Sequence, residues 1–199
     1  MRSNVNHPKK SAQPLPQLRI IGGQWRSRKL SFAEVEGLRP TPDRVRETLF
    51  NWLQNTIAGA KCLDLFAGSG ALGIEALSRG AQNCTFIDIS PASCSTLKAN
   101  LTLLKCNQGN VLQRDASQWL AQCPEAIEGV GAFDLIFLDP PFRQGHCQAL
   151  CDQLVEKKLL APKAYVYIET EHDAQIVTSW RLHREKRSGQ VHYRLYQVD

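Results

Sequence analysis

A glycine-rich loop between a predicted strand and a predicted helix constrains the fold of this chain more than any other feature. Residues 64–73 read Asp-Leu-Phe-Ala-Gly-Ser-Gly-Ala-Leu-Gly, and the three glycines follow the spacing G-x-G-x-x-G. The apolar run before the loop predicts a strand at 62–66, and the run after it predicts a helix at 71–78. Such a loop is typical of a doubly wound α/β sheet that binds an adenine-containing cofactor. The spacing alone does not say which cofactor.

The rest of the chain continues this alternation of strands and helices. The predicted strands lie at 84–87, 110–113, 132–138 and 164–170, and the predicted helices lie at 92–104, 117–121 and 148–157. Alternating units of this kind favour a parallel sheet with helices on both faces. Residues 180–186 and 192–197, joined through Ser188 and Gly189, predict a hairpin that adds an antiparallel strand. We therefore expect an α/β fold with a mostly parallel sheet.

The N-terminal quarter of the chain differs from the rest in charge. Residues 1–46 carry ten Lys and Arg and three acidic residues, a net charge of +7, whereas residues 47–199 carry 14 basic and 16 acidic residues, a net charge of −2. A region that concentrates positive charge attracts polyanions, so this asymmetry favours an N-terminal nucleic-acid-binding region. The alternative is a solvated basic tail without a function.

This quarter divides into three predicted parts. Residues 1–17 are polar and rich in proline, which predicts a disordered tail, and residues 18–40 predict a β-hairpin with Gly22 and Gly23 at its turn. A helix follows from 41 to about 57, with Thr41 as its N-cap, Pro42 at its first position and an apolar stripe at Val45, Leu49, Trp52 and Leu53. Trp25 could stack on RNA or pack in the protein. The residues expected to contact phosphates are Arg19, Arg26, Arg28, Lys29, Arg39, Arg44 and Arg46.

The composition excludes several classes of protein. Seven cysteines without a Cys-x-x-Cys pair form neither a disulfide framework nor a zinc set, and we expect reduced thiols in a cytoplasmic protein. The sequence has no apolar run of the roughly 18 residues that a membrane span needs, and its first residues lack the apolar core of a signal peptide. We expect no metal site and no membrane association.

A short segment after the strand at 132–138 carries the chemistry. Residues 139–142 read Asp-Pro-Pro-Phe. An exocyclic amine of a nucleobase is a poor nucleophile, because its lone pair is delocalised into the ring, so an enzyme that methylates it must hold and aim the amine. The Asp139 carboxylate and the Pro140 carbonyl can each accept an amine hydrogen. Pro140 and Pro141 stiffen the turn, and Phe142 offers a face on which a flipped base can stack. The alternative is a tight turn that merely ends a strand.

Two observations favour S-adenosyl-L-methionine over a nicotinamide cofactor. Asp64 suits a positively charged amino acid group and would gain nothing from a pyrophosphate, and the Asp-Pro-Pro-Phe segment has no role in hydride transfer. Asp88 can accept the ribose hydroxyls of either cofactor, whereas Asp115 can accept the adenine amine or cap a helix. The predicted cofactor-binding residues are Thr41, Asp64, Phe66, Ala67, Gly68, Ser69, Gly70, Asp88, Ile89, Asp115 and Ala116.

Several stretches together resemble one family. They are Arg19-Ile20-Ile21-Gly22-Gly23, Arg28-Lys29-Leu30, Leu38-Arg39-Pro40-Thr41 with 43–50, and the segments 63–80, 139–142, 189–191 and 193–196. Across nearly all of its expected ordered length the chain is similar to the bacterial ribosomal RNA small-subunit methyltransferase D family, whose members methylate N2 of one guanine in 16S rRNA. The block before the fold, Arg-Pro-Thr followed by Asp-Arg-Val-Arg-Glu, is the most specific match. Ser27 and Asp88 are mild departures, since the family often has glycine at the first position and many methyltransferases have glutamate at the second.

The resemblance implies an α/β class I S-adenosyl-L-methionine-dependent methyltransferase fold, with a seven-stranded, mostly parallel, Rossmann-like sheet and a small N-terminal β-hairpin. It implies a methyltransferase domain at 41–199 and an RNA-binding hairpin at 18–40. It also implies a 16S rRNA substrate within the assembled or assembling small ribosomal subunit, and we expect a monomer. Positioning by Asp139 and its neighbours then carries catalysis, so that neither a metal nor a covalent nucleophile is needed.

Three other functions stay open on the residues alone. An adenine-N6 methyltransferase would use the same Asp-Pro-Pro-Phe segment, although a DNA enzyme of that kind usually needs a large recognition domain. A non-catalytic RNA-binding assembly factor could keep the fold without turnover. A nicotinamide-dependent oxidoreductase is disfavoured by Asp64. The choice of guanine over adenine rests on the resemblance.

Overall fold

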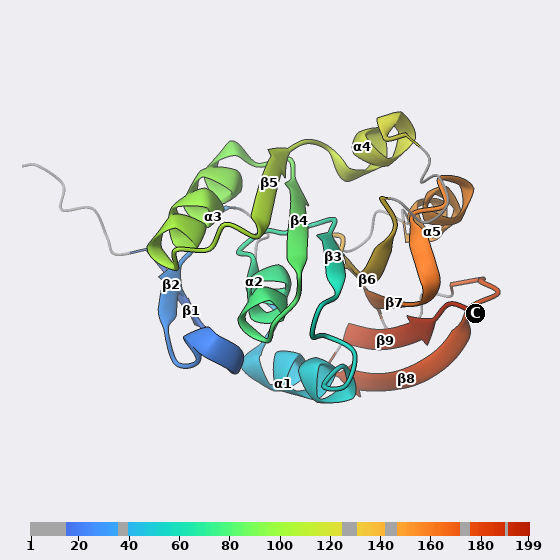
Figure 1. The fold of residues 1–199 in the computed structure, drawn as a ribbon, viewed down its shortest axis with the longest axis horizontal. Coiled ribbons are helices and arrows are strands. Elements are labelled where there is room, and N and C mark those ends of the chain that lie inside the picture. Colours follow the sequence, from blue (N-terminus) through green and yellow to red (C-terminus); the bar gives the residue numbers. More distant parts are fainter. Residues whose placement is uncertain (1–14, 36–39, 125–130, 142–146, 172–175, 190) are drawn as a thin grey trace, which may run out of the picture.

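A seven-stranded sheet forms the centre of the part of the chain that the computed structural model describes, which is residues 15–35, 40–124, 131–141, 147–171, 176–189 and 191–199 (Figure 1). The strand order is β5-β4-β3-β6-β7-β9-β8. The first five strands in this order are parallel, and β9 runs antiparallel to both β7 and β8. The expected sheet and its closing hairpin are confirmed. The bounds are β3 Lys61–Asp64, β4 Asn83–Asp88, β5 Gly109–Gln113, β6 Phe133–Leu138, β7 Leu160–Glu171, β8 Arg181–Ser188 and β9 Val191–Gln197.

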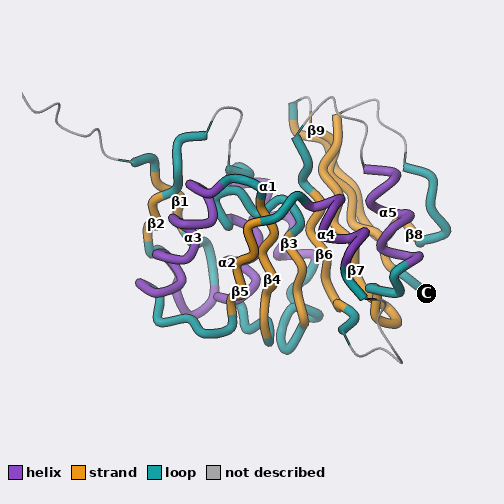
Figure 2. Tube along the Cα trace, turned by 90° about the horizontal axis from the view of Figure 1, so that it is seen from above, coloured by secondary structure: helices purple, strands orange, loops and turns teal. Residues whose placement is uncertain are grey.

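Helices cover both faces of this sheet, because the central strands bury apolar side chains on both sides. One core includes Phe86, Phe137 and Tyr193 and packs against the first three helices, whereas the other includes Ile87 and Ile136 and packs against the last two. Figure 2 shows the strands side by side, with α3 and α5 at opposite ends of the row. The bounds are α1 Asp43–Trp52, α2 Ala71–Ser78, α3 Pro91–Leu103, α4 Ala116–Gln122 and α5 Cys147–Glu156. In the described part of the chain, no helix is both long and apolar enough to cross a bilayer.

The order of the strands reverses direction at β3. After β3 the chain builds β4 and β5 on one side, and it then returns to form β6 on the other side of β3. Ligands of open α/β sheets bind outside the carboxyl ends of the strands at such a switch point. The site is therefore expected where β3 and β6 end, at Asp64 and Asp139.

The N-terminal hairpin packs directly on the main fold. Strand β1, Gln17–Arg19, pairs antiparallel with β2, Lys29–Ser31, and the short 3-10 helix η1, Gly23–Trp25, lies in the connection. Leu18, Ile20 and Leu30 are buried in the same core as α1 and α2. Gly23 has a φ of 75°, and a Cβ atom there would lie 1.8 Å from the Ser78 carbonyl oxygen. This close approach requires glycine at the point where the hairpin meets α2.

The predicted start and end of α1 are wrong. Pro42, with φ −56° and ψ 146°, is the N-cap and makes no side-chain cap hydrogen bond, so the helix begins at Asp43. Thr41 does not cap the helix, because its hydroxyl lies near Asp139 instead. The helix ends at Trp52 and not near Ile57, since Leu53 already has a ψ of 1°. β7 begins four residues early at Leu160, and the strands of the N-terminal hairpin, predicted within 18–40, end at Ser31. The remaining elements start and end within two residues of their predicted bounds.

Candidate active site

Four acidic side chains gather at the carboxyl edge of the sheet. Asp64, Asp88 and Asp139 end or directly follow β3, β4 and β6, and Glu169 lies near the end of β7. Asp64 is only 3% exposed, and its burial, reinforced by the negative charges of Asp139 and Asp88, raises its pKa to about 7. Acidic groups crowded in this way attract a ligand that brings positive charge. This edge therefore suits a cationic cofactor better than an anionic one.

The glycine loop is shaped by close packing on all sides. Gly70 has a φ of 77°, and a Cβ atom there would lie 2.5 Å from a methyl carbon of Leu97. A Cβ atom on Gly73 would lie 2.2 Å from the ring of Phe86, and the Gly73 amide donates to the Asp64 carboxylate at 3.1 Å. The loop therefore needs these glycines to follow the sheet edge closely.

Asp88 is held in one orientation by backbone donors. One carboxylate oxygen accepts from the Gly68 amide at 2.7 Å, and the other accepts from the Ser90 amide at 2.8 Å. A carboxylate offers about four acceptor positions, so two hydroxyl groups can still bind. The next residue, Ile89, leaves 68% of its surface exposed. This arrangement of a fixed acceptor beside an exposed apolar side chain fits a ribose with its base.

The other predicted cofactor residues differ in what they can reach. Asp115 is the N-cap of α4 and accepts from the Gln118 amide at 2.9 Å, so the capping interpretation is confirmed and its second oxygen stays available. Ala116 and Ala67 are almost fully buried, and Phe66 is partly buried against the second core. They can contact a ligand mainly through backbone atoms.

Asp139 is partly buried where β6 ends. The Thr41 hydroxyl donates to its carboxylate at 3.5 Å, a long hydrogen bond. Burial raises the pKa of Asp139 to about 6, although the Thr41 hydroxyl opposes the rise. Pro140 is buried and Pro141 is exposed, while Phe142 lies outside the described residues.

Glu169 is a site residue that the sequence analysis missed. Leu138 pairs with Ile168, so Asp139 and Glu169 follow at the same level of neighbouring parallel strands. Glu169 is 4% exposed and accepts from the Tyr167 hydroxyl at 2.8 Å. Burial, reinforced by the Asp139 charge, raises the pKa of Glu169 to about 8, although the hydroxyls of Tyr167 and Thr41 oppose the rise. A buried acidic residue is rare unless it is paired. The position of Glu169 inside an apolar strand was therefore the signal that the sequence offered.

The pKa of Glu169 predicts a pH dependence of stability. A raised pKa favours the protonated folded state, so stability is full below the unfolded pKa and is lost as the pH rises through about 8. Glu169→Gln keeps a neutral side chain at every pH. Between acidic and alkaline pH, we therefore expect the free energy of unfolding to fall by about 2 kcal/mol less in this variant than in the wild type. Urea unfolding at acidic, neutral and alkaline pH measures this difference. Glu47→Gln, an exposed change on α1, is the control, and equal pH profiles for Glu169→Gln and the wild type would contradict the assignment.

Arg46 was expected to contact RNA, and this prediction is wrong because its side chain is 1% exposed. Its guanidinium donates to the carbonyls of Thr41 at 3.1 Å and Arg19 at 2.9 Å, and it pairs with Asp43 at 2.6 Å. It also lies 3.7 Å from the buried Glu75 carboxylate. Arg46 therefore joins the hairpin, α1 and α2, and it fixes the backbone of Thr41, whose side chain reaches Asp139.

Glu75 completes this connection from the α2 side. Its two oxygens accept from the amides of Ile21 and Gly22, both at 2.8 Å, and Arg79 donates to it at 2.7 Å. The hairpin is thus bound to the same helix that follows the glycine loop.

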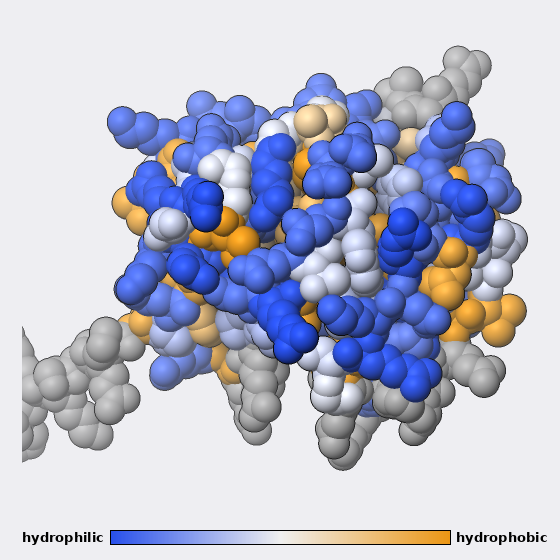
Figure 3. Space-filling view, turned by 90° about the horizontal axis from the view of Figure 1, so that it is seen from below, coloured by the Kyte–Doolittle hydropathy of each residue, from blue (hydrophilic) through white to orange (hydrophobic). Residues whose placement is uncertain are grey.

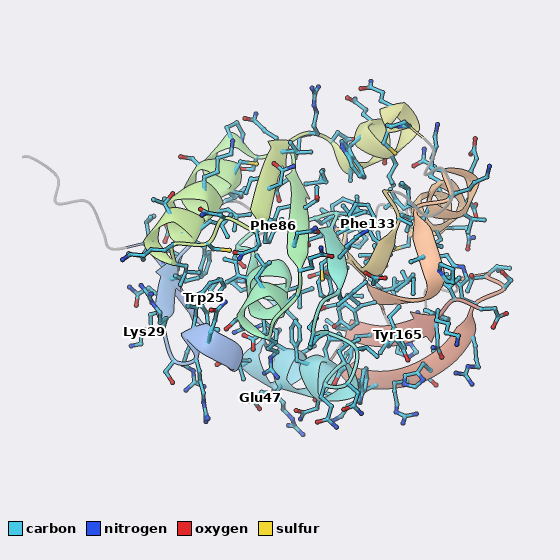
Figure 4. The ribbon with its side chains drawn as sticks, in the orientation of Figure 1. Trp25, Lys29, Glu47, Phe86, Phe133 and Tyr165 are labelled. Atoms are coloured by element: carbon cyan, nitrogen blue, oxygen red, sulfur yellow. The ribbon has the colours of Figure 1, made fainter. Side chains whose placement is uncertain are left out.

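The remaining predicted RNA contacts lie on the surface. Arg19, Arg26, Arg28 and Lys29 are exposed on the hairpin, and Arg44 is exposed on α1, whereas Arg39 lies outside the described residues. Arg19 also pairs with Asp43 at 3.1 Å. Figure 4 shows Lys29 at the rim of the molecule and Trp25 further inside. Trp25 packs against the first core, which supports the packing interpretation of this residue.

Known proteins are similar to this chain in sequence and in fold. Residues 18–197 match the family model described as Conserved hypothetical protein 95. The chain is 49% identical over 184 residues to an Escherichia coli (strain K12) protein named ribosomal RNA small subunit methyltransferase D, covering 91% of this chain and 90% of that protein. The solved structure of yhhF from Escherichia coli has a TM-score of 0.83 at 48% identity and covers 92% of this chain and 99% of that one.

A more distant solved structure carries a cofactor product. It is an RNA methyltransferase from Salinibacter ruber in complex with S-adenosyl-L-homocysteine, with a TM-score of 0.60 at 16% identity, covering 80% of this chain and 94% of that one. At this identity the likeness shows a shared fold.

Proposed function

This chain belongs to the ribosomal RNA small subunit methyltransferase D family, and we propose that it methylates the exocyclic N2 amine of a specific guanine in 16S rRNA. It is a ribosomal RNA methyltransferase, and its proposed cofactor is S-adenosyl-L-methionine, because the acidic residues at the strand ends suit a cationic ligand with a ribose. The observation that carries the choice of an amine acceptor is the position of Asp139 and Pro140 at the switch point of the sheet, beside the glycine loop. We further propose that it acts as a monomer on assembled or assembling small subunits.

The residues of the loop and the neighbouring strand ends fit the cofactor. When bound, S-adenosyl-L-methionine supplies an electrophilic methyl group on a positively charged sulfur. Asp64 lies where it can balance the cationic amino acid part, and Asp88 accepts the ribose hydroxyls beside the exposed Ile89. Asp115 can accept the adenine amine through the oxygen that does not cap α4. The glycine loop lets the backbone come close to the ligand.

Positioning of the guanine is the chemical task of the second half of the site. The Asp139 carboxylate and the Pro140 carbonyl each accept one hydrogen of N2, which directs the remaining lone pair toward the methyl donor. Phe142 is proposed to stack on the flipped base. Burial raises the pKa of both Asp139 and Glu169, and the Asp139 charge raises that of Glu169, so Glu169 is favoured in its neutral form beside the charged Asp139. Holding reactants in such a geometry can contribute about 7–11 kcal/mol in favourable cases.

The experiment that tests this function uses small subunits from cells that lack this protein. The full-length chain and labelled S-adenosyl-L-methionine are incubated with these subunits, and the RNA is digested to nucleosides. We expect the label in N2-methylguanosine of 16S rRNA and none with subunits from wild-type cells, whose site is already modified. Label in N6-methyladenosine would refute guanine as the target, and the absence of label in any RNA would refute the function.

A further inference from the structure

The edge strand β8 presents a row of positive charge on one side of the sheet. Residues 181–188 contain four basic residues and one acidic residue, a net charge of +3 within a segment, 47–199, whose total is −2. Among the described strands, β8 pairs with β9 alone, so its outer edge is open. Arg181, Arg184 and Lys186 are all exposed. Figure 3 shows the face that carries α1 and β8, the lower side in Figure 1, and hydrophilic residues predominate on it.

The strand register places these three side chains on the same face. Arg181 pairs with Gln197, Arg184 with Leu195 and Lys186 with Tyr193, and partners in an antiparallel pair point to the same side. Tyr193 belongs to the core under α1, and its ring lies 5.7 Å from that of Trp52. The face of β8 that carries Arg181, Arg184 and Lys186, here named the β8 basic face, is therefore the α1 side. Glu185 points to the other side, where it binds His192 at 2.8 Å.

Burial, together with the positive charge of the β8 basic face, lowers the pKa of His183, which lies on the same strand. A register shift in the pairing with β9 occurs at His183, between Leu182 and Arg184. The His183 ring lies 5.3 Å from the Tyr165 ring in an edge arrangement. Burial lowers the pKa of His183, and the charges of Arg184 and Arg181 lower it further. Arg184 donates to the His183 carbonyl at 3.0 Å, which uses one of the five N–H donors of its guanidinium.

The β8 basic face begins in the same row as the proposed catalytic residue. Asp139 and Glu169 lie at one level of neighbouring strands, Glu169 pairs with Tyr193, and Tyr193 pairs with Lys186. Lys186 is thus three strand spacings from Asp139, or about 14 Å. Arg184 follows about 7 Å further along the strand, a step similar to that between successive phosphates of a nucleic acid strand. The proposed catalytic residue Asp139 and the cations of the β8 basic face therefore lie along one line across the sheet.

We propose that the β8 basic face binds the phosphate backbone of the RNA segment next to the target nucleotide, on the side of the site away from the N-terminal hairpin. This inference rests on the proposed function. Charged side chains on an edge strand, lysine above all, also prevent edge-to-edge pairing, but that role does not require them to share one face. Here one face carries a single sign, in a segment that is otherwise acidic, and it begins beside the site. RNA then contacts two basic surfaces, and the target base enters between them.

The test compares two double variants of the full-length protein. Arg184→Gln with Lys186→Gln removes two charges from the β8 basic face, and Lys157→Gln with Lys163→Gln removes two charges from the end of α5 and the start of β7. Binding to small subunits from cells lacking this protein is measured between about 50 and about 200 mM KCl. We expect the β8 variant to bind roughly tenfold more weakly and to lower the slope of log K against log salt by about 1.5, because each phosphate contact contributes about 0.7–0.9.

Catalysis gives an independent readout of the same variants. Since neither residue belongs to the proposed catalytic machinery, the β8 variant is expected to raise KM and to keep kcat within about twofold at saturating subunits. A slope and a KM equal to those of the control variant would overturn the inference and leave β8 with an edge-protecting role. The proposed function is judged separately, by the nucleoside that the wild-type protein modifies. A wild type that methylates the subunit normally beside an unaffected β8 variant therefore rejects the inference alone.

Discussion

Asp139→Ala is expected to lower the rate of methyl transfer by at least about 100-fold and to leave the affinity for S-adenosyl-L-methionine nearly unchanged. In the proposed function the Asp139 carboxylate fixes the acceptor amine, so its loss lets the amine turn away from the methyl group. The carboxylates proposed to hold the cofactor, Asp64 and Asp88, lie on other strands and stay in place. Single-turnover transfer to small subunits measures the rate, and a calorimetric titration measures the affinity.

Asp88→Ala is the matched control for this variant. It also removes a carboxylate from the carboxyl edge of the sheet, but from the side where Asp88 fixes the Gly68 amide and is proposed to accept the ribose hydroxyls. Its main expected effect is weaker cofactor binding. If Asp139→Ala kept most of the wild-type rate, or lost as much cofactor affinity as Asp88→Ala, the assignment of Asp139 to the acceptor amine would be wrong.

The cofactor loop could be predicted from the sequence because its constraints are local. The positive φ of Gly70 and the close approach of Gly73 to Phe86 disfavour any residue with a side chain at those two positions. The spacing of glycines after a strand therefore predicts the conformation of the loop. The turn at Asp139 and Pro140 is equally local, since it directly follows an apolar run. Topology then brings these two segments together at the switch point, and alternating strands and helices predict that topology.

Composition could not show that Arg44 is exposed and Arg46 is buried, although helical periodicity favoured that difference. Arg46 lies three and four residues before the buried Leu49 and Phe50, so a period of 3.6 places it on the apolar side of α1 and Arg44 away from it. The partners of Arg46 come from segments that are distant in the sequence, such as Glu75, and no local pattern reveals them. The same is true of Glu169, whose pKa is raised by burial and by the charge of Asp139 at the end of another strand.

The β8 basic face is a second feature that could not be predicted from the sequence. The sequence Arg-Leu-His-Arg-Glu-Lys-Arg reads as a mixed charged strand, and an even alternation would place Arg181 and Arg184 on opposite faces. The register shift at His183 brings Arg184 to the side of Arg181 and Lys186. One irregular residue therefore decides which charges share a face, and sequence periodicity does not locate such a bulge.

Arg46→Ala is expected to destabilise the fold by about 3–5 kcal/mol, the usual cost of removing one partner of a buried ion pair. The change leaves the carbonyls of Arg19 and Thr41 without a donor, and it takes a cation away from Glu75, whose side chain is fully buried. Urea unfolding measures the loss. Arg44→Ala, two residues away on the exposed side of α1, is the control and is expected to stay within about 0.5 kcal/mol of the wild type.

Arg46→Lys separates the geometry of this contact from its charge. Lysine keeps the positive charge near Glu75 and Asp43, but it lacks the planar fork that reaches two carbonyls and a carboxylate together. We therefore expect an intermediate stability and a folded protein in which the Thr41 backbone is less firmly held, so that methyl transfer is slower while cofactor affinity is kept. A stability of Arg46→Ala equal to that of Arg44→Ala, together with a rate of methyl transfer equal to that of the wild type, would show that apolar packing alone holds the hairpin and the turn at Asp139. A loss of both stability and rate in Arg46→Ala, with Arg46→Lys between it and the wild type, would show that one buried guanidinium connects the N-terminal hairpin to Thr41 and, through the Thr41 hydroxyl, to Asp139.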